Sequence, residues 1–276
     1  MKTILVPTDY SDTSLEALKF AVDIAGIYQA RLLVFHAFEI PDGILFDYPF
    51  KGDMIKVMKD KSKLSYENWI KKLDTQNVNV HFEVEQNSTV SAIRRVIEAK
   101  EIDLVVMGTH GITGLSEFFV GSTTEKIVRF SPVPVFSVKK SVKADKLKNI
   151  IFPTGLAFNE TRLVKKVKEL QLLFKSKLHI IYVNTPTNFK QDMVLEGMLK
   201  DYVAHYQFEN YKTKIVSDMF EQAGIMNYAN RQKDAVIAMG THSHRGLTHF
   251  FRGSIAEDLV NHENNPIWTY SLKNED

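Results

Sequence analysis

A glycine-rich segment followed by hydroxyl side chains has the residue types and spacing to bind an anion. Gly108 to Glu125 read GTHGITGLSEFFVGSTTE and come directly after the apolar run IDLVVM. Glycines let backbone N–H groups point at a ligand, and a helix that begins after them adds the partial positive charge of its N-terminus. The hydroxyls of Ser122–Thr124 and the imidazole of His110 can donate to phosphate oxygens. The segment is therefore a candidate phosphate-binding site.

A simple turn explains the same glycines. Gly108, Gly111 and Gly121 can reverse the chain and let a helix pack closely on a strand. The segment is not a Walker loop, because no Gly-Lys-Ser/Thr follows it. It is not the dinucleotide fingerprint either, which belongs after the first strand of a fold. On the glycines alone, the turn and the phosphate cradle both stay open.

The chain contains two copies of the same four blocks in the same order. KTILVPTDYSDTSLEAL, from Lys2, is similar to KNIIFPTGLAFNETRLV, and RLLVFHAFEIP is similar to KLHIIYVNTP. The glycine-rich block recurs from Lys233, and SPVPVFSVKK recurs from Asn264. The offset is 146 residues for the first two blocks and 132 for the third. A polar, lysine-rich segment, 138–149, joins the copies, so we predict two domains, residues 1–140 and 147–276.

Within each copy, strand patterns alternate with helix patterns. TILVPT, LLVFHAF, VNVHFEVE, IDLVVMG and PVPVFSV are predicted strands of the first copy. Residues 11–25, 54–73, 90–100 and 122–130 are predicted helices; Ser11 and Thr13 are both N-cap candidates for the first, Thr13 with Glu16 as a capping box. The alternation predicts a doubly wound α/β domain, a five-stranded parallel sheet with helices on both faces, present twice. Ligands of such sheets lie beyond the carboxyl ends of the strands, where the glycine-rich segment falls.

The composition excludes several classes of function. The net charge of +2 is too small to argue for nucleic acid or an anionic membrane as a partner. The chain has no cysteine, which excludes disulfides and thiol catalysis, and no apolar run approaches the ~20 residues of a membrane helix. The opening residues lack the long apolar stretch of a signal peptide. We expect a cytoplasmic protein.

The spacing Gly-x-x-Gly, nine residues, Gly-Ser resembles the ATP-binding signature of the universal stress protein family. The opening ILVPTDYS and the closing PVPVFSVKK are similar to the first and last strands of that family. The resemblance covers nearly the whole chain, as two tandem domains. It implies an adenine nucleotide alpha hydrolase-like fold, ATP as the ligand with Mg²⁺ as a candidate counter-ion, and a regulatory role in a stress response.

The resemblance also assigns contacts in the first copy. It implies that Asp9 lies near the base and ribose, that the backbone of Ala37 contacts the adenine, and that the glycine-rich segment borders the ribose and phosphates. The nucleotide-binding residues would be Pro7, Thr8, Asp9, Ala37, Gly108, Thr109, His110, Gly111, Gly121, Ser122, Thr123 and Thr124.

Three positions near this set carry their own interpretations. Asp9 can equally be a turn or helix-capping residue. His36 ends an apolar strand and is expected to be a satisfied core histidine rather than a ligand. The family often has a glycine before the third helix, where this chain has Gln86-Asn87; asparagine tolerates a left-handed backbone.

The second copy lacks several of these groups. Gly155 replaces Asp9, Ser243 replaces Gly111, and the hydroxyl run becomes Ser254-Ile255-Ala256. We therefore predict one competent nucleotide site and one degenerate site. The second loop contains His242, His244 and His249, so three alternatives stay open for it: a basic exposed loop, a metal site, or a site for another phosphorylated molecule.

No catalytic group pair is evident in the sequence. A regulatory ATP-binding module is therefore the leading hypothesis, and at most weak ATPase activity or autophosphorylation at Ser122 or Thr123 is the enzyme alternative. An interaction scaffold with vestigial sites is the third. Family members commonly pair through their last strands, so PVPVFSV and NPIWTYS should meet across a pseudo-twofold axis within one chain. The chain would then be an intramolecular pseudo-dimer, with a further homodimer open.

Overall fold

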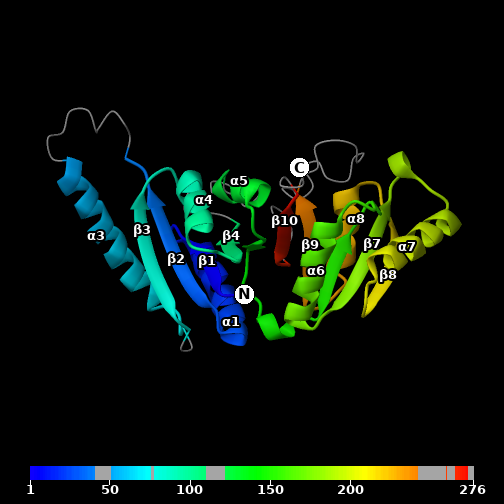
Figure 1. The fold of residues 1–276 in the computed structure, drawn as a ribbon, viewed down its shortest axis with the longest axis horizontal. Coiled ribbons are helices and arrows are strands. Elements are labelled where there is room, and N and C mark those ends of the chain that lie inside the picture. Colours follow the sequence, from blue (N-terminus) through cyan, green and yellow to red (C-terminus); the bar gives the residue numbers. More distant parts are fainter. Residues whose placement is uncertain (41–50, 76–77, 110–121, 242–258, 260–264, 273–276) are drawn as a thin grey trace.

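The computed structural model describes residues 1–40, 51–75, 78–109, 122–241, 259 and 265–272 (Figure 1). The first half alternates five strands with helices, as the sequence predicts. Its elements are β1 (Thr3–Pro7), α1 (Asp12–Tyr28), β2 (Arg31–Phe38), α3 (Lys51–Ile70), β3 (Val80–Gln86), α4 (Thr89–Ala99), β4 (Leu104–Gly108), α5 (Ser122–Phe130) and β5 (Val135–Val138).

The second half repeats this order after a short connecting helix, η1 (Ala144–Lys146). Its elements are β6 (Asn149–Pro153), α6 (Thr161–Phe174), β7 (Lys177–Asn184), η2 (Pro186–Asn188), α7 (Asp192–Tyr206), β8 (Tyr211–Ser217), α8 (Glu221–Ala229), β9 (Ala235–Thr241) and β10 (Ile267–Ser271). No helix among the described residues is long and apolar enough to cross a membrane.

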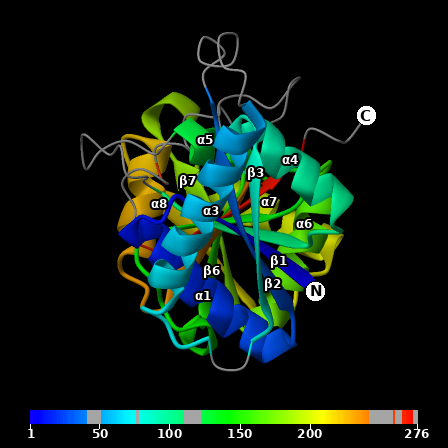
Figure 2. The same cartoon turned by 90° about the vertical axis from the view of Figure 1, so that its left-hand side faces the viewer.

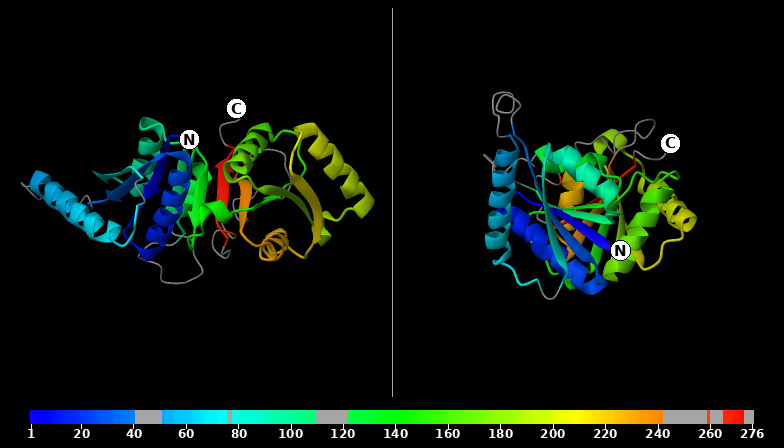
Figure 3. Two further views of the ribbon diagram at one scale, coloured as in Figure 1. Left: turned by 90° about the horizontal axis from the view of Figure 1, so that it is seen from below. Right: turned by 60° about the vertical axis from the view of Figure 1, so that its left-hand side comes forward.

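The ten strands of the described residues form one sheet, in the order β3-β2-β1-β4-β5-β10-β9-β6-β7-β8. Neighbouring strands are parallel within each half, and among the described strands only the central pair, β5 and β10, is antiparallel. Figures 1 and 3 show the two halves side by side, with β5 and β10 at their junction. The predicted pairing of the two last strands is confirmed by this register.

Helices cover both faces of the sheet, because successive residues of a strand point to opposite faces. Ile4 and Val6 of β1 pack with α1 in one buried cluster, whereas Leu5 packs with α4 and α5 in the other. Figure 2, which views the first half from its outer end, shows α1 and α3 on one side of the strands and α4 on the other. The prediction of a doubly wound α/β fold in each half is confirmed.

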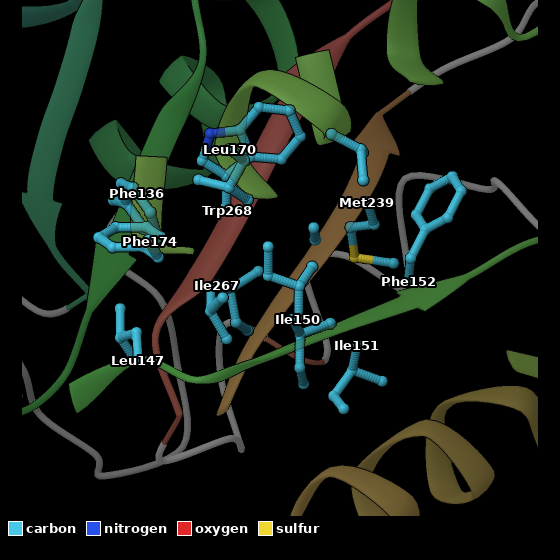
Figure 4. Close-up of a cluster of buried hydrophobic side chains, with 14 of the residues drawn as sticks. Phe136, Leu147, Ile150, Ile151, Phe152, Leu170, Phe174, Met239, Ile267 and Trp268 are labelled. Atoms are coloured by element: carbon cyan, nitrogen blue, oxygen red, sulfur yellow. The ribbon is translucent and has the colours of Figure 1, made fainter. Parts of the chain in front are cut away.

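The centre of the sheet is a pair of aromatic residues related by the repeat. Phe136 of β5 lies opposite Trp268 of β10 in the antiparallel register. Val135 pairs with Val105 in the first half and Ile267 pairs with Ile237 in the second, so the 132-residue offset of the third block also makes Phe136 and Trp268 equivalent to each other. A pseudo-twofold axis therefore passes between them. Phe136 and Trp268 are 0% and 2% exposed and belong to one core with residues of α1 and α6. Figure 4 shows both of them with Leu170 and Phe174 of α6.

Three local predictions need correction. The N-cap of α1 is Ser11, whose side chain accepts from Ser14 N, so the capping box that starts at Thr13 does not form. Helix α3, predicted over 54–73, covers Lys51–Ile70. Asn87 is not among the non-glycine residues with positive φ, so its tolerance of a left-handed backbone is not used.

Candidate functional site

The carboxyl ends of β2, β1 and β4 lie next to one another, and β2 is the longest of the three. Pro7, the last residue of β1, pairs with Phe35, whereas β2 continues to Phe38. The last part of β2, residues 36–38, therefore extends past β1. We call this step the notch. His36 and Ala37, which border it, are only partly buried.

A tight turn follows β1 and shapes the floor of the notch. Tyr10 has a φ of 65°, and its backbone N–H donates to Oγ1 of Thr8 over 2.9 Å. The Thr8 hydroxyl is buried and also lies 3.0 Å from the hydroxyl of Ser14. Because a positive φ is unfavourable for tyrosine, the Thr8 bond and the packing of the ring must stabilise it.

The Tyr10 side chain is fixed between α3 and β2. Its hydroxyl donates to the carbonyl of Ser62, and its ring centroid lies 4.7 Å from that of His36 and 6.1 Å from that of Trp69. Burial raises the pKa of the Tyr10 phenol to about 12, against the weaker effect of the Ser62 bond. The tyrosine is therefore a neutral structural group.

His36 is a satisfied histidine, as the sequence predicts. Its Nδ1 donates to the carbonyl of Thr8 over 2.8 Å. Burial lowers the pKa of His36, opposed by the Thr8 bond and by the negative charge of Asp9. The ring is thus neutral near pH 7 and holds the end of β1 to β2.

Asp9 lies at the open side of the turn and is half-buried. Its Oδ1 accepts from the backbone N–H of Ser11 over 3.1 Å. This bond is the turn and capping role that the sequence offers as an alternative. The negative charge of Asp9 also opposes the pKa decrease of the His36 ring.

Gly108, at the end of β4, is required by packing. A Cβ there would lie 2.8 Å from the backbone carbon of Thr13 and 2.9 Å from its oxygen. Only glycine lets β4 approach the first turn of α1 so closely. The turn interpretation therefore accounts for this glycine without a ligand.

The start of α5 is attached to the end of β4. The buried hydroxyl of Thr124 donates to the carbonyl of Gly108 over 2.8 Å. Thr109, which follows Gly108, is also buried, and its backbone N–H donates to the carbonyl of Val138. Thr124 therefore uses its hydrogen inside the protein, whereas Thr123 of the same turn is half-buried.

The remaining predicted residues have no described geometry. His110, Gly111 and Gly121 lie outside the described residues, and Ser122 is described only as the first residue of α5. In the second half, Ser243, Ser254, Ile255, Ala256, His242, His244 and His249 also lie outside them. Within the described ranges, no three His, Asp or Glu side chains form a potential metal site.

The second half has the same turn after its first strand. Leu156 has a φ of 62°, and its N–H donates to Oγ1 of Thr154 over 2.9 Å. Beyond this turn the two halves differ. Tyr182 and Val183, the equivalents of His36 and Ala37, are 2% and 0% exposed.

In the second half, the segment after β7 is hydrogen-bonded to the end of that strand, at the counterpart of the notch. The side chain of Asn184 donates to the carbonyl of Lys190 over 2.9 Å and accepts from its N–H over 3.1 Å. The ammonium group of Lys190 reaches the Tyr182 hydroxyl over 3.2 Å. The end of β7 is therefore covered by the segment that contains η2.

Glu160, which replaces Ser14 in the repeat, was missed by the sequence analysis. Its side chain is 2% exposed and accepts from the hydroxyl of Tyr202 over 2.9 Å, while its backbone N–H donates to Tyr206. The carboxylate also lies 3.4 Å from the Thr154 hydroxyl. A carboxylate thus lies buried under the second turn, where the first half has a hydroxyl. Its alignment with Ser14 was the available signal.

The arrangement of the sheet can be compared with known proteins. The model of the universal stress protein family matches residues 1–139 and again 146–270. This chain belongs to the universal stress protein family.

Curated relatives match one half of the chain at a time. A universal stress protein of Methanocaldococcus jannaschii is 31% identical over 143 residues, which cover 51% of this chain and 84% of the relative. One from Thermus aquaticus is 30% identical over 142 residues, covering 50% of this chain and 98% of the relative. The tandem chain is thus about twice one such domain.

A solved structure has the same two-domain fold. The universal stress protein from Archaeoglobus fulgidus superposes with a TM-score of 0.75 at 18% identity, over 98% of both chains. Another solved family member, in complex with cAMP, covers 51% of this chain and 98% of its own at 22% identity, with a TM-score of 0.35.

Proposed function

We propose that the first half of this universal stress protein binds an adenine nucleotide, ATP, at the notch, and that the second half has lost this site. The base would lie along the end of β2 beside Ala37. The phosphates would extend past the end of β4 toward the start of α5. Asp9 would accept from the ribose hydroxyls. The protein would act in the cytoplasm as a regulatory module of a stress response.

The difference in exposure between the two notches carries this proposal. His36 and Ala37 are partly exposed, whereas their equivalents Tyr182 and Val183 are fully buried. A ligand pocket in an open parallel sheet is expected at this edge, where the strand order reverses between β1 and β4. A site that stays open in one copy and is closed in the other is what one retained binding function predicts.

The side chains under the two turns also differ. In the second half Glu160 is buried there, accepts from the Tyr202 hydroxyl and lies 3.4 Å from the Thr154 hydroxyl. At the equivalent position the first half has the neutral hydroxyl of Ser14. The start of α5 adds the partial positive charge of a helix N-terminus, and the Thr124–Gly108 bond holds it beside β4.

The bonds of Thr124 and Asp9 refine their proposed roles. Because the Thr124 hydroxyl donates to Gly108, we assign it to positioning α5, and leave phosphate contacts to the backbone, Ser122 and Thr123. Asp9 accepts from Ser11 with Oδ1, so it serves the turn and the ligand together.

Regulation rather than turnover is the proposed output. Nucleotide occupancy would shift the population of two conformations and so alter a partner surface. The paired strands β5 and β10 would let a single chain mimic a dimer. Slow ATP hydrolysis or autophosphorylation at Ser122 or Thr123 is the alternative output, and a scaffold without a working site is the third.

Titration calorimetry of the full chain with ATP and Mg²⁺ tests the site. Asp9→Asn removes the charge but keeps an acceptor for Ser11, so the turn should survive. Asp12→Asn is the matched control, because Asp12 is the first residue of α1 and its side chain is 95% exposed. We expect at least about tenfold weaker binding for Asp9→Asn, which corresponds to roughly 1.4 kcal/mol, and no change for Asp12→Asn.

Two outcomes would count against the proposal. No binding at millimolar ATP with Mg²⁺ would leave only the scaffold. Steady phosphate release that Asp9→Asn abolishes would favour the enzyme alternative. ATP that remains bound without hydrolysis through hours of incubation supports the regulatory module.

A further inference from the structure

An open groove runs along the outer edge of the second half. It lies between helix α7 and strand β8, and its volume is about 640 Å³. Because β8 ends the sheet, one of its edges has no neighbouring strand among the described residues. Most of the groove is accessible to a partner: Glu196, Lys200 and Thr213 line it and are exposed, and Tyr211 is 39% exposed.

The first half fills the corresponding space with its own aromatic rings. At the opposite end of the sheet, α3 lies beside the other edge strand, β3 (Figure 1). There Tyr66 of α3 stacks on Phe82 of β3, with ring centroids 4.1 Å apart and an interplanar angle of 7°. Both rings are partly buried and pack against the core. The stacked pair therefore occupies the space between helix and edge strand.

The strand partner of that pair is a small residue in the second half. Phe82 pairs with Val34 of β2, and Thr213 pairs with Ile180 of β7. Val34 and Ile180 are equivalent by the 146-residue offset. Thr213 therefore stands where the first half has Phe82, and it is one of the residues that line the groove.

The helix partner is also smaller. Trp69 of α3 and Tyr206 of α7 donate to equivalent backbone carbonyls after the first strands of the two halves. They are thus equivalent residues, and three positions before each of them lie Tyr66 and Val203. Val203 lines the groove opposite β8. The groove is therefore the place from which two stacked rings are missing, although both elements that form it are described.

The backbone of β8 presents unpaired groups beside this groove. The Asn210 carbonyl accepts from the Leu178 N–H, and the Asp218 N–H donates to the Asn184 carbonyl. Backbone groups alternate between the two edges of a strand, so the even-numbered residues of β8 bond to β7. The N–H and C=O groups of the odd-numbered residues in 211–217 face outward. An added strand could pair with them.

The charges of β8 indicate what kind of strand would fit. Lys212 and Lys214 flank Thr213 on the other face of the strand, because successive side chains alternate. Neither lysine forms an ion pair with the described residues. Opposite charges in directly opposed strand positions attract, and like charges repel. Two copies of β8 paired about their centres would place Lys214 opposite Lys214, so an acidic partner fits better than a second copy.

We propose that the groove binds an extended, acidic segment of a partner protein, which adds a strand to β8 and inserts an aromatic side chain between Thr213 and Val203. The residues on either side of that aromatic residue are acidic and pair with Lys212 and Lys214. Main-chain bonds give affinity in this mode of recognition, and the inserted ring gives specificity. In the first half the stacked rings already occupy this space. The proposal does not depend on nucleotide binding at the notch.

Fluorescence anisotropy of a labelled peptide with blocked ends tests the proposal on the full chain. The peptide Thr-Val-Glu-Phe-Glu-Val-Thr has the length of β8, seven residues, and places both glutamates on the face opposite the phenylalanine. We expect saturable binding. Replacing both glutamates by lysine, or the phenylalanine by alanine, should weaken it at least about tenfold.

Variants of the chain locate the binding site. Lys214→Glu should weaken binding about fivefold. Lys165→Glu is the matched control, because it makes the same change of net charge on the exposed face of α6, and it should bind the peptide as the unchanged chain does. Val203→Tyr combined with Thr213→Phe installs the two rings of the first half and should abolish binding.

Ile215→Pro separates added-strand pairing from a folding defect in that double variant. Proline at this outward position removes an N–H of the free edge and leaves the bonds to β7 intact. It should weaken peptide binding while the melting temperature stays close to that of the unchanged chain. Equal binding by all these proteins would place the peptide elsewhere and overturn the proposal. A homodimer that Ile215→Pro dissociates would also overturn it, because a second copy would then be the occupant.

Discussion

The two halves share the turn after their first strand but not what surrounds it. Tyr10 and Leu156 have φ values of 65° and 62°, and both N–H groups donate over 2.9 Å to a threonine hydroxyl. The notch above this turn is open in the first half and covered in the second. The turn is thus part of the framework, and its presence alone does not indicate a ligand. The open notch is the feature that separates the copies.

The first helices of the halves also begin at different points. Ser11 caps α1, but its equivalent is Ala157, and α6 begins only at Thr161. The equivalent carbonyls are nevertheless bound in the same way. Trp69 Nε1 donates to the Ser11 carbonyl over 3.3 Å, and the Tyr206 hydroxyl donates to that of Ala157 over 3.1 Å. Different side chains therefore make the same kind of hydrogen bond in the two halves.

The largest expected difference between the halves is in acid stability. His179 of β7 is 1% exposed, while its equivalent in β2 is Leu33. Burial lowers the pKa of His179 to about 4, with smaller contributions from the charges of Lys212 and Lys177; its Nδ1 lies 3.2 Å from the Tyr228 hydroxyl. Between about pH 6.5 and 4 the unfolded chain binds a proton that the folded chain does not. His179 therefore costs no stability at pH 7. As the pH falls from about 6.5 to 4, its titration lowers the free energy of unfolding by roughly 3 kcal/mol.

His179→Leu installs the residue of the first half and should remove this loss. We expect similar urea unfolding free energies for both proteins at pH 7, and a more stable variant at pH 4.5. Unfolding should be followed by the fluorescence of Trp268, because His179 and Trp268 both lie in the second half. Parallel pH dependence in the two proteins would show that another group causes the acid instability.

The next difference is the space at the glycine that ends the fourth strand. Gly108→Ala places its Cβ against the backbone of Thr13, which cannot move without shifting α1. Gly240→Ala meets the side-chain carbon Cδ2 of Leu163 at 2.9 Å instead. We expect the first change to cost about 2 kcal/mol and the second about 1 kcal/mol, each partly offset by the lower entropy of the unfolded alanine chain.

Urea unfolding monitored by Trp69 and Trp268 in the separate halves measures both changes. Equal losses of unfolding free energy would mean that α1 shifts as easily as the Leu163 side chain. The close approach of β4 to α1 would then not be the reason for a glycine at position 108. A matched loss of ATP affinity is expected only for Gly108→Ala, since Gly240 borders the closed notch.

The sequence predicts the framework well because parallel strands covered on both faces are short apolar runs. ILV at 4–6 and LVVM at 104–107 are such runs, and they are neighbouring strands. For the second half, the sequence predicts a degenerate site only from the loss of ligand groups. The structure shows that the notch is also covered, through the Asn184–Lys190 hydrogen bonds. These bonds depend on how the segment after β7 folds back, which the sequence pattern does not indicate. Glu160 was missed because its partners Tyr202 and Tyr206 are 42 and 46 residues away.

The smallest effect concerns the caps of the two first helices. Ser11→Ala removes the acceptor for Ser14 N and should cost about 1 kcal/mol in the first half. Ala157→Ser, the reverse change at the equivalent position, should leave stability unchanged, because α6 starts too far along the chain for a serine at 157 to cap it. Unfolding followed at Trp69 and Trp268 distinguishes the two. A gain of stability from Ala157→Ser would mean that residues 157–160 can become helical, and that the late start of α6 results from the missing cap rather than from the Glu160 contacts with Tyr202 and Tyr206.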